Sequence, residues 1–426
     1  MSVKNLSLTF YFPYREVSGV PVLFSRLVNH IAEHNKKVKL FVIDYIDGAI
    51  AVNLINNDSI SLIPFEDGKR VEVPQNSTLI LQAILPYSIR PELVIPEETK
   101  IIFWCLHPDN LVPIVLPVPY LRNLQNKSFI FYKIISKLFF YKTLKRLSSF
   151  VNLCIEKNAI WFMDQSNFDK LSKYLFIDLP SVDFVPVPSV KAFEWQRKEI
   201  ALGTKEKLNI CWIGRLCDFK SHILIYTIQR LSEIAKEMKI PIQYYVIGRG
   251  PFEEKIKKLI VNNDYFEIIV KGAMNPVELD EFILSDIDVI SAMGTSALEG
   301  AKFGSPVILL DISYYPIKGD YLFRWLHDTI NFDLGHDITH KDINTGNNSL
   351  KQILNDLIYN YKQLSDLSYS YFIKNHDIEI VSNLVIKNAT ESNFCFSDID
   401  KRLLHKSLLR RMHDKFRSYL NLNMYR

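Results

Sequence analysis

Hydrophobic and polar positions follow two alternating patterns along most of the chain. Short apolar runs, typical of buried strands, are followed by stretches whose apolar residues recur at the i, i+3, i+4 and i+7 spacing of one helix face. The first such helix carries Phe24, Leu27, Val28 and Ile31. Because parallel strands need a crossover between them, this alternation predicts parallel βαβ units. The strands expected in the first half are Leu6–Phe12, Val38–Ile43, Thr78–Gln82, Lys100–Cys105 and Ala159–Met163.

The pattern lapses in the charged stretch around Val190–Lys207 and then restarts. A new helix face is marked by Leu224, Ile228 and Leu231. Asn275–Pro276 is a favourable N-cap and first-turn pair for another helix. The strands expected in this second half are Leu208–Ile213, Ile242–Ile247, Phe266–Val270, Ile287–Ser291 and Pro306–Asp311.

These patterns predict an α/β protein of two domains, which also fits the 426 residues at about 100–200 residues for a domain. We expect an N-terminal domain over 1–190, a linker over 191–207, a second domain over 208–375 and a basic, amphipathic helical extension over 376–426. In open parallel sheets, ligands bind outside the carboxyl ends of the strands. Functional residues are therefore expected in the loops that follow strands.

Composition adds one unusual feature, the distribution of glycine. Apolar residues at 48% and charged residues at 23% are ordinary for a globular protein and exclude wholesale disorder. The chain has 14 glycines where average usage gives roughly 30. Codon bias accounts for the scarcity but not for the clustering, since eight of them fall between residues 203 and 304. We expect the clustered glycines where the backbone needs a positive φ or a ligand approaches closely.

Charge, cysteine content and hydropathy exclude several classes. The net charge of +4 is too small to favour a nucleic acid as partner, and no nucleic-acid-binding motif is present. Five scattered cysteines without a C-x-x-C pair fit a reducing compartment and predict no structural zinc. The sequence shows no signal-peptide pattern and no apolar run of about 18 residues. We expect a cytoplasmic protein, soluble or peripheral on the inner face of the cell membrane.

Two cations follow the strand Leu208–Ile213. After Gly214 turns the chain, Arg215 and Lys220 come near the predicted start of a helix. Basic side chains beside the unsatisfied N–H groups of a helix start are typical of an anion site. The alternative interpretation is that both are solvated surface residues.

A second strand-to-helix turn is formed by Gly294, Thr295 and Ser296, again in a pattern suited to phosphate. Glu299 falls on the first turns of the following helix, where a carboxylate can accept hydrogen bonds from the two hydroxyls of a ribose. The alternative is that Glu299 only complements the helix dipole.

Four stretches, IGRLCDFK, YYVIGRGP, VKGAMNP and GTSALEGAKFGSPVI, resemble the C-terminal domain of GT-B-fold glycosyltransferases, in particular the retaining nucleotide-sugar family 4, in order and spacing. The resemblance implies two Rossmann-like, doubly wound domains that face each other across a cleft. It implies transfer of a sugar from a nucleotide sugar to a glycan or lipid-linked acceptor in bacterial surface polysaccharide (lipopolysaccharide, O-antigen or capsule). It implies no cofactor beyond the donor and no metal.

The resemblance also implies roles by position. Arg215 and Lys220 would neutralise the donor diphosphate and the charge that develops as the glycosidic bond breaks, and Glu299 would hold the ribose. Gly19, at a weaker match in the first domain, would bring its N–H toward the diphosphate, and His107 would reach the transferred sugar. Ala273 and Met274 would border the nucleobase, and Gly294, Thr295 and Ser296 would lie beside the phosphates or sugar. The remaining donor-binding positions are Gly214 and Gly248.

The sequence departs from the family in the Glu-x7-Glu pair, because Ser291 occupies the first position and only Glu299 is present. In the family the missing glutamate contacts the donor sugar, so the sugar and the stereochemical outcome stay open. Asp109 is the candidate catalytic base if the reaction inverts the anomeric centre. We favour retention, which needs no such base.

Two segments suggest an anionic membrane surface as a further partner. The segment 110–155 lacks acidic residues and mixes lysines with aromatic side chains, which suits a headgroup layer. In the segment 401–426, Leu409, Met412, Phe416 and Leu420 form an apolar stripe beside arginines and lysines. The alternative for both is a helix packed on its own domain with a solvated basic rim.

Three other functions were weighed. A GT-B-fold sugar-nucleotide epimerase needs catalytic carboxylates that the sequence does not reveal. A non-catalytic two-domain protein that binds a nucleotide or a sugar stays open. A dinucleotide-dependent dehydrogenase is disfavoured, because Gly248 and Gly250 are not followed by the third glycine and the acidic residue of that fingerprint.

Overall fold

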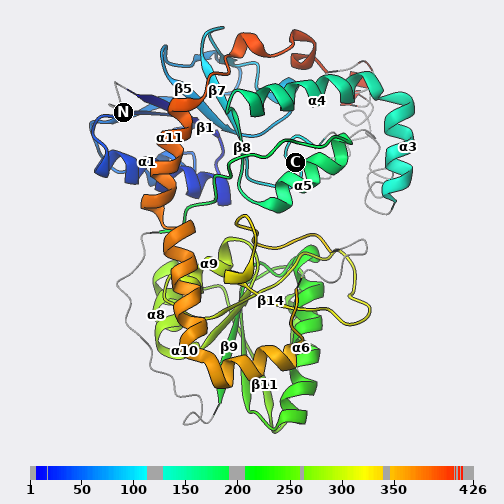
Figure 1. Ribbon diagram of the computed structural model, residues 1–426. Helices are drawn as coiled ribbons and strands as arrows, with labels where there is room; N and C mark the ends of the chain where they lie inside the picture. The colour runs from blue at the N-terminus through cyan, green and yellow to red at the C-terminus, as the bar shows by residue number, and fades with distance from the viewer. Residues whose placement is uncertain are drawn as a thin grey trace. The chain divides into compact units, whose positions relative to one another are not determined.

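The computed structural model describes residues 6–16, 18–112, 128–190, 207–259, 263–338, 346–406, 408, 411–412 and 414–415 (Figure 1). The chain divides into two compact units. Unit 1 comprises Met1–Val187 and Val381–Arg426, and unit 2 comprises Pro188–Ile380. The predicted linker lies outside the described residues except for Lys207, and the predicted cleft between the domains stays a prediction.

Unit 1 is built on a six-stranded sheet in the order β3-β2-β1-β5-β7-β8, and all of its pairs are parallel. The strand order reverses between β1 and β5, as in doubly wound sheets. A second, two-stranded sheet pairs β4 with β6. The strands are β1 (Ser7–Tyr11), β2 (Lys39–Asp44), β3 (Ile60–Pro64), β4 (Val71–Glu72), β5 (Thr78–Gln82), β6 (Leu93–Val94), β7 (Lys100–Cys105) and β8 (Ile160–Phe162).

Helices cover both faces of this sheet. On β7, the Trp104 ring stacks on Phe24 of α1, whereas the neighbouring Phe103 packs edge-on against Phe150 of α4. Because successive strand residues point to opposite faces, α1 and α4 lie on opposite sides. The helices are α1 (Gly19–His34), α3 (Phe129–Phe139), α4 (Tyr141–Glu156) and α5 (Gln165–Leu175), with short 3-10 turns η1 (Ala51–Asn53) and η2 (Pro86–Ser88).

The chain returns to unit 1 from Val381 onward. The Ile101 N–H donates to the Phe394 carbonyl at 3.0 Å, and the Phe394 ring packs edge-on against Phe103 and Phe150. Part of the predicted extension over 376–426 therefore contributes to the unit 1 core, with Phe394, Ile399 and Leu403 buried there. The elements here are α11 (Ile378–Glu391), η5 (Phe396–Asp398) and η6 (Lys401–Leu404). Of the predicted tail stripe, Leu409, Phe416 and Leu420 lie outside the described residues, and Met412 is exposed.

Unit 2 repeats the plan with the order β11-β10-β9-β12-β13-β14, in which only the β13–β14 pair is antiparallel. Tyr244 of β10 lies in the core that α6 covers, whereas Tyr245 packs against Phe282 of α8, so these helices lie on opposite faces (Figure 1). The strands are β9 (Leu208–Ile213), β10 (Ile242–Ile247), β11 (Phe266–Gly272), β12 (Val289–Ala292), β13 (Val307–Leu309) and β14 (Arg324–Trp325). The helices are α6 (Asp218–Met238), α7 (Glu253–Lys257), α8 (Pro276–Asp286), α9 (Thr295–Ala301), η4 (Leu326–Asp328) and α10 (Leu350–Asn375).

The predicted parallel strands are all confirmed to within two residues, and Asn275 caps α8 as expected. The strands β3, β4, β6 and β14 were not predicted. Strand β3 has no fully buried residue, and the other three have two residues each, so their sequences carry little periodic signal. Among the described residues, no helix combines the length and the apolar character needed to cross a membrane.

Candidate functional site

The carboxyl edge of the unit 2 sheet gathers most of the predicted site residues. The strand order reverses between β9 and β12, and this reversal is where open α/β sheets bind ligands. Gly214 and Arg215 follow β9, and Gly294 comes two residues after β12. The topology therefore places both predicted anion-binding turns at one reversal point.

Three glycine loops at this edge lie backbone against backbone. The Gly214 N–H donates to the Ile247 carbonyl at 3.0 Å, and the Gly248 N–H donates to the Gly272 carbonyl at 2.8 Å. Gly248 has a φ of 143°, and a Cβ atom there would collide with the Gly214 carbonyl oxygen. The clustering of glycine thus has a cause inside the protein, which is the close approach of neighbouring loops.

Lys220 and Arg215 are placed beside these loops. The Lys220 Nζ lies 3.6 Å from the position that a Cβ on Gly214 would occupy, so the ammonium lies against the glycine turn. Burial lowers the pKa of Lys220, and the nearby Arg215 guanidinium lowers it further, while Cys217 acts in the opposite direction. Within the described part of the chain, neither cation forms an ion pair. A bound anion would relieve the repulsion between the Arg215 guanidinium and the Lys220 ammonium.

Arg249 was missed by the sequence reasoning. It follows Gly248, its carbonyl accepts from the Leu216 N–H at 3.0 Å, and its Nε lies 3.6 Å from where a Cβ on Gly272 would stand. The side chain is exposed, and no carboxylate in the described ranges forms an ion pair with it. The signal is a cation between two glycines at a strand end, inside the YYVIGRGP stretch, in which the sequence predicted a role only for Gly248.

The predicted nucleobase loop lies between β11 and α8. Ala273 is exposed and Met274 is half-buried. The loop ends in a capping box, in which the Asn275 side chain accepts from the Glu278 N–H at 3.0 Å and the Glu278 carboxylate accepts from the Asn275 N–H at 3.2 Å. This cap fixes the direction in which the short loop leaves the sheet.

The turn before α9 depends on Gly294, which has a φ of 62° and serves as the N-cap. Its N–H donates to the Leu334 carbonyl at 2.7 Å, and a Cβ on it would meet no atom within 4 Å. Glycine is therefore needed here for its backbone conformation rather than for space. Thr295 is exposed and Ser296 is half-buried.

Glu299 is held by a buried cation. The Lys302 ammonium bridges Glu299 Oε2 and Asp280 Oδ1, both at 2.6 Å, and the Lys302 side chain is only 4% exposed. The Glu299 side chain itself is 23% exposed. The ion pair fixes the carboxylate through Oε2 and leaves Oε1 for a further hydrogen bond. Lys302 and Asp280 were not predicted, since only the i, i+3 spacing of Glu299 and Lys302 is visible in the sequence.

Ser291, at the position of the family's first glutamate, is fully buried in β12. Its hydroxyl accepts from the Tyr244 hydroxyl at 3.2 Å. This position therefore faces the core of unit 2 in this chain.

The remaining candidates, Gly19, His107 and Asp109, belong to unit 1. Gly19 is the first residue of α1, and a Cβ on it would meet nothing within 4 Å. His107 follows β7, and its Nδ1 accepts from the Asp109 N–H at 3.1 Å, so the neutral ring carries its hydrogen on Nε2. The Asp109 carboxylate pairs with Lys170 at 2.7 Å. Partial burial lowers the pKa of His107, Asp109 raises it, and Lys170 lowers it.

The structure thus places several predicted residues at one edge of the unit 2 sheet: Gly214, Arg215, Lys220, Gly248 and Gly294. It joins Glu299 to an unpredicted buried ion pair. In the described ranges, no group of three or more His, Cys, Asp or Glu residues is arranged to hold a metal ion. The expectation that the reaction needs no metal stays a prediction.

No protein-family model and no curated protein matches the sequence. Among solved structures, the chain is similar to a glycosyltransferase from Rickettsia africae ESF-5, at 12% identity and a TM-score of 0.51, over 95% of this chain and 100% of that one. WaaG, a glycosyltransferase involved in lipopolysaccharide biosynthesis, aligns at 13% identity and a TM-score of 0.48, over 90% and 100%. A UDP-glucose:anthocyanidin 3-O-glucosyltransferase in complex with UDP aligns at 12% and 0.42, over 92% and 100%.

At these identities the likeness shows the fold alone, and of these three structures only the Rickettsia protein exceeds a TM-score of 0.5. Together with the strand order of both sheets, it confirms the predicted α/β class and GT-B fold. Membership of family 4 stays a prediction.

Proposed function

We propose that the protein is a glycosyltransferase that moves a sugar from a nucleotide-sugar donor to a glycan or lipid-linked acceptor. The observation that carries this proposal is the group of three cations, Arg215, Lys220 and Arg249, on adjacent loops at the carboxyl edge of the unit 2 sheet. No ion pair of the described chain neutralises them. A donor diphosphate supplies the missing negative charge, and the same cations stabilise it as the leaving group.

Two further findings support this function. Three of the four stretches that resemble family 4 span the ends of β9, β10 and β11 and the loops after them, and the fourth begins at the Gly294 turn and continues through α9. The Rickettsia protein with the same fold is itself named a glycosyltransferase. In the proposed complex, Glu299 Oε1 accepts from the donor ribose, and Ala273 and Met274 border the base.

The finer parts of the proposal concern acceptor and outcome. We propose bacterial surface polysaccharide as the product, on the inner face of the cell membrane, with an anionic membrane surface as an additional partner. We favour retention of anomeric configuration. Asp109 is engaged by Lys170, so a role as base would require that ion pair to open.

The test begins with thermal stability in the presence of each common nucleotide sugar, followed by release of the nucleoside diphosphate with the stabilising donor. Lys220→Ala and Arg215→Ala should each lower turnover by about 100-fold or more, as loss of one charge-stabilising group does in other active sites. Lys236→Ala is the matched control, because Lys236 is an exposed lysine on the same helix.

Donor binding that survives both substitutions would contradict the site. Stabilisation by a nucleotide sugar without turnover on any acceptor would favour the binding-protein alternative. A changed sugar configuration in the recovered nucleotide sugar would favour the epimerase. The anomeric configuration of the product, read by NMR, decides between retention and inversion.

A further inference from the structure

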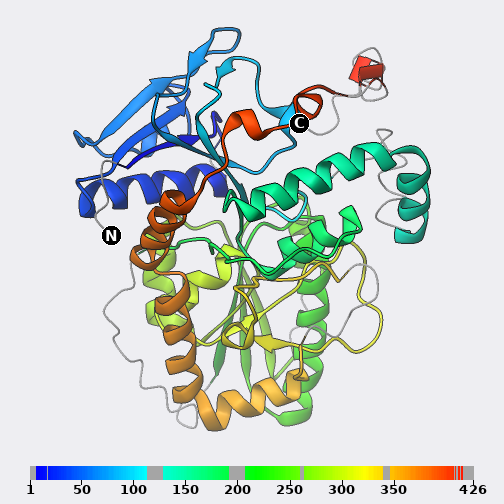
Figure 2. The same cartoon turned by 45° about the horizontal axis from the view of Figure 1, so that its top comes forward.

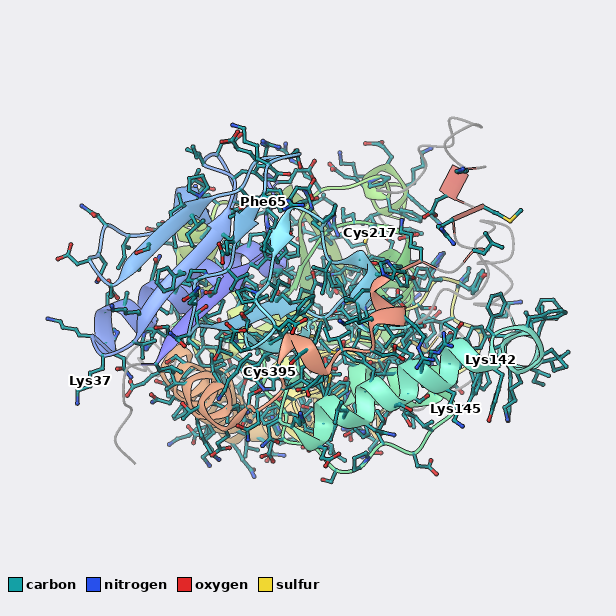
Figure 3. The ribbon with its side chains drawn as sticks, turned by 90° about the horizontal axis from the view of Figure 1, so that it is seen from above. Lys37, Phe65, Lys142, Lys145, Cys217 and Cys395 are labelled. Atoms are coloured by element: carbon teal, nitrogen blue, oxygen red, sulfur yellow. The ribbon has the colours of Figure 1, made fainter. Side chains whose placement is uncertain are left out.

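A basic pocket of about 350 Å³ lies in unit 1 between α4 and the C-terminal segment, and it contains none of the proposed donor-site residues. Lys142, Lys145, Arg146 and Ser149 line it at the i, i+3, i+4 and i+7 positions of α4, so they share one helix face. Figure 3 shows Lys142 and Lys145 along α4.

The carboxylates of the pocket are already engaged by other cations. Asp398 pairs with Lys157 at 2.7 Å, and Asp400 holds the guanidinium of Arg402 through both oxygens. The charge of Arg146 also acts on Asp400, but none of the three α4 cations forms an ion pair with a described residue. Four cations, Lys142, Lys145, Arg146 and Arg402, line the pocket with two carboxylates, Asp398 and Asp400, so the lining is positive on balance.

The walls of the pocket are well packed. The buried Phe150, which lines the pocket from α4, packs edge-on against Phe394, whose ring centroid lies 5.9 Å away. Phe394 is in turn hydrogen-bonded through its carbonyl to the start of β7. The basic side chains therefore project from elements fixed by the unit 1 core, which favours a binding site over a loose surface cluster.

An exposed apolar stripe adjoins the pocket along the chain. Helix α3 ends at Phe139 immediately before α4 begins, and it lies at the end of α4 (Figure 2). Ile130, Ile134 and Leu138, at i, i+4 and i+8, have exposed fractions of 72%, 53% and 71%. The opposite face of α3 packs through Tyr132 on the aromatic residues of α5. A helix that is apolar on both faces is typical of one that contacts an apolar phase.

We propose that the α4 pocket binds the phosphate of an anionic membrane phospholipid while the Ile130–Ile134–Leu138 stripe of α3 enters the boundary of the acyl chains. Cations next to an exposed apolar stripe match the two parts of such a lipid, its charged headgroup and its hydrocarbon. The inference deepens the proposed function, since it assigns the membrane partner of the proposed transferase to specific residues.

Vesicle flotation of the full chain tests the pocket, with phosphatidylcholine vesicles that contain or lack phosphatidylglycerol. The wild type should bind only the anionic vesicles. The triple variant Lys142→Gln/Lys145→Gln/Arg146→Gln should lose about 100-fold in partition coefficient, since each basic residue near an anionic surface contributes about fivefold. No donor is present, so the result is independent of the outcome at Arg215 and Lys220.

The matched control is Lys36→Gln/Lys37→Gln/Lys39→Gln, which removes the same charge from exposed lysines of the same unit. Lys37 lies across unit 1 from Lys142 and Lys145 (Figure 3). The control should lose less than tenfold. An equal loss in both triple variants would mean that only net charge matters, which overturns the pocket.

A second pair of variants tests the stripe. Ile130→Ser/Leu138→Ser should lower vesicle binding at least tenfold and retain the thermal unfolding temperature, because both side chains are exposed. Ile46→Ser/Val52→Ser, which changes exposed apolar residues elsewhere in unit 1, should bind as the wild type does. Vesicle binding unchanged by the α3 substitutions would overturn the insertion.

A titration with inorganic phosphate alone distinguishes a lipid headgroup from a soluble phosphate as the ligand of the α4 pocket. Thermal stability should show no saturable difference between the wild type and the α4 triple variant as inorganic phosphate is added. If phosphate stabilises only the wild type while both proteins bind vesicles equally, the pocket serves a soluble phosphate and the lipid proposal is wrong.

Discussion

The two units share one strand order, but they fix loops beside their sheets by different means. In unit 2, a buried guanidinium, Arg324, bridges Asp311 and Asp333 at 2.7 Å each, and the Leu334 carbonyl next to this bridge holds the Gly294 N–H. In unit 1, one buried carboxylate, Asp44, accepts four backbone N–H groups and forms no ion pair with a described residue. The same strand order is thus stabilised by an ion-pair network in unit 2, where the edge strand β14 is antiparallel, and by backbone hydrogen bonds in unit 1.

This difference affects what each unit can bind. In unit 2 the buried carboxylates Asp311 and Asp333 pair with Arg324, and the cations of the sheet edge form no ion pair with the residues that the structure describes. In unit 1 the candidate base Asp109 is paired with Lys170, and the pocket cations lie on α4 instead. Identical strand order therefore does not predict where free charge lies, which is set by side chains from distant parts of the chain.

The largest expected effect comes from Arg324→Leu, which should destabilise unit 2 by about 3–5 kcal/mol, because two buried carboxylates lose their cation. Urea unfolding measures it, with the exposed Arg230→Leu as control. Burial raises the pKa of Asp333 while His336 and Arg324 lower it, so losing the guanidinium raises this pKa further, with His336 still opposing the rise. The deficit should therefore be greatest at neutral pH and shrink in acid, where Asp333 binds a proton. A deficit independent of pH would contradict this account.

Gly248→Ala should cost about 2–3 kcal/mol, because the new methyl group collides with the Gly214 carbonyl and φ is positive. Gly68→Ala in unit 1 is the matched control, since φ is 78° there but a Cβ meets nothing within 4 Å. It should cost only about 1 kcal/mol in urea unfolding, which is the penalty for a Cβ in the left-handed region. Equal costs would show that conformation, rather than loop contact, keeps glycine at 248.

These two predictions mark what the sequence revealed and what it did not. The strands, the α8 cap and the glycine loops of unit 2 were predictable because their signals are local: periodicity, an N-cap pair, or glycine at a strand end. From the sequence, the clustered glycines were explained by positive φ angles or by the close approach of a ligand. That explanation is incomplete, because glycine is also needed at position 248 to avoid a collision with the Gly214 carbonyl.

Long-range partners were not predictable. Asp280 reaches Lys302 from 22 positions away, and Asp398 reaches α4 through Lys157 only after the chain returns to unit 1. A single sequence carries no periodic signal for such pairs. The acid-free stretch 110–155 did indicate the basic face of α4, but the pocket required the C-terminal segment as its second wall.

Lys302→Met should weaken donor binding about tenfold with little change in kcat, because Glu299 loses the ion pair that orients it. Lys302→Arg should restore part of the affinity. The comparison in unit 1 is Lys170→Met, which removes the ion pair between Lys170 and Asp109 and should leave the donor KM unchanged. Isothermal titration and initial rates measure both. A fall in kcat alone for Lys302→Met would contradict the positioning role.

Donor affinity should decrease several-fold as pH rises into the alkaline range. Burial and the Arg215 charge lower the pKa of Lys220 in the free protein, and a bound diphosphate favours its protonated form. The ammonium is fully present below the lowered pKa and lost above it, so affinity falls with rising pH. Lys220→Arg, which stays charged, should remove the dependence. Titration with the nucleoside diphosphate measures it, and a pH dependence retained in Lys220→Arg would assign it elsewhere.

The smallest effect on stability is expected from Gly19→Ala. This substitution also tests directly whether unit 1 uses its glycine for the donor, as unit 2 is proposed to do. Gly19 begins α1, and a methyl group there meets no atom within 4 Å, so stability should be unchanged or rise by up to about 1 kcal/mol. Thermal unfolding measures that half of the prediction. If the Gly19 N–H approaches the donor diphosphate, the same methyl group should lower turnover several-fold. Unchanged turnover would mean that unit 1 keeps this glycine without using it for the donor, and that the glycine loops of the two units serve different purposes.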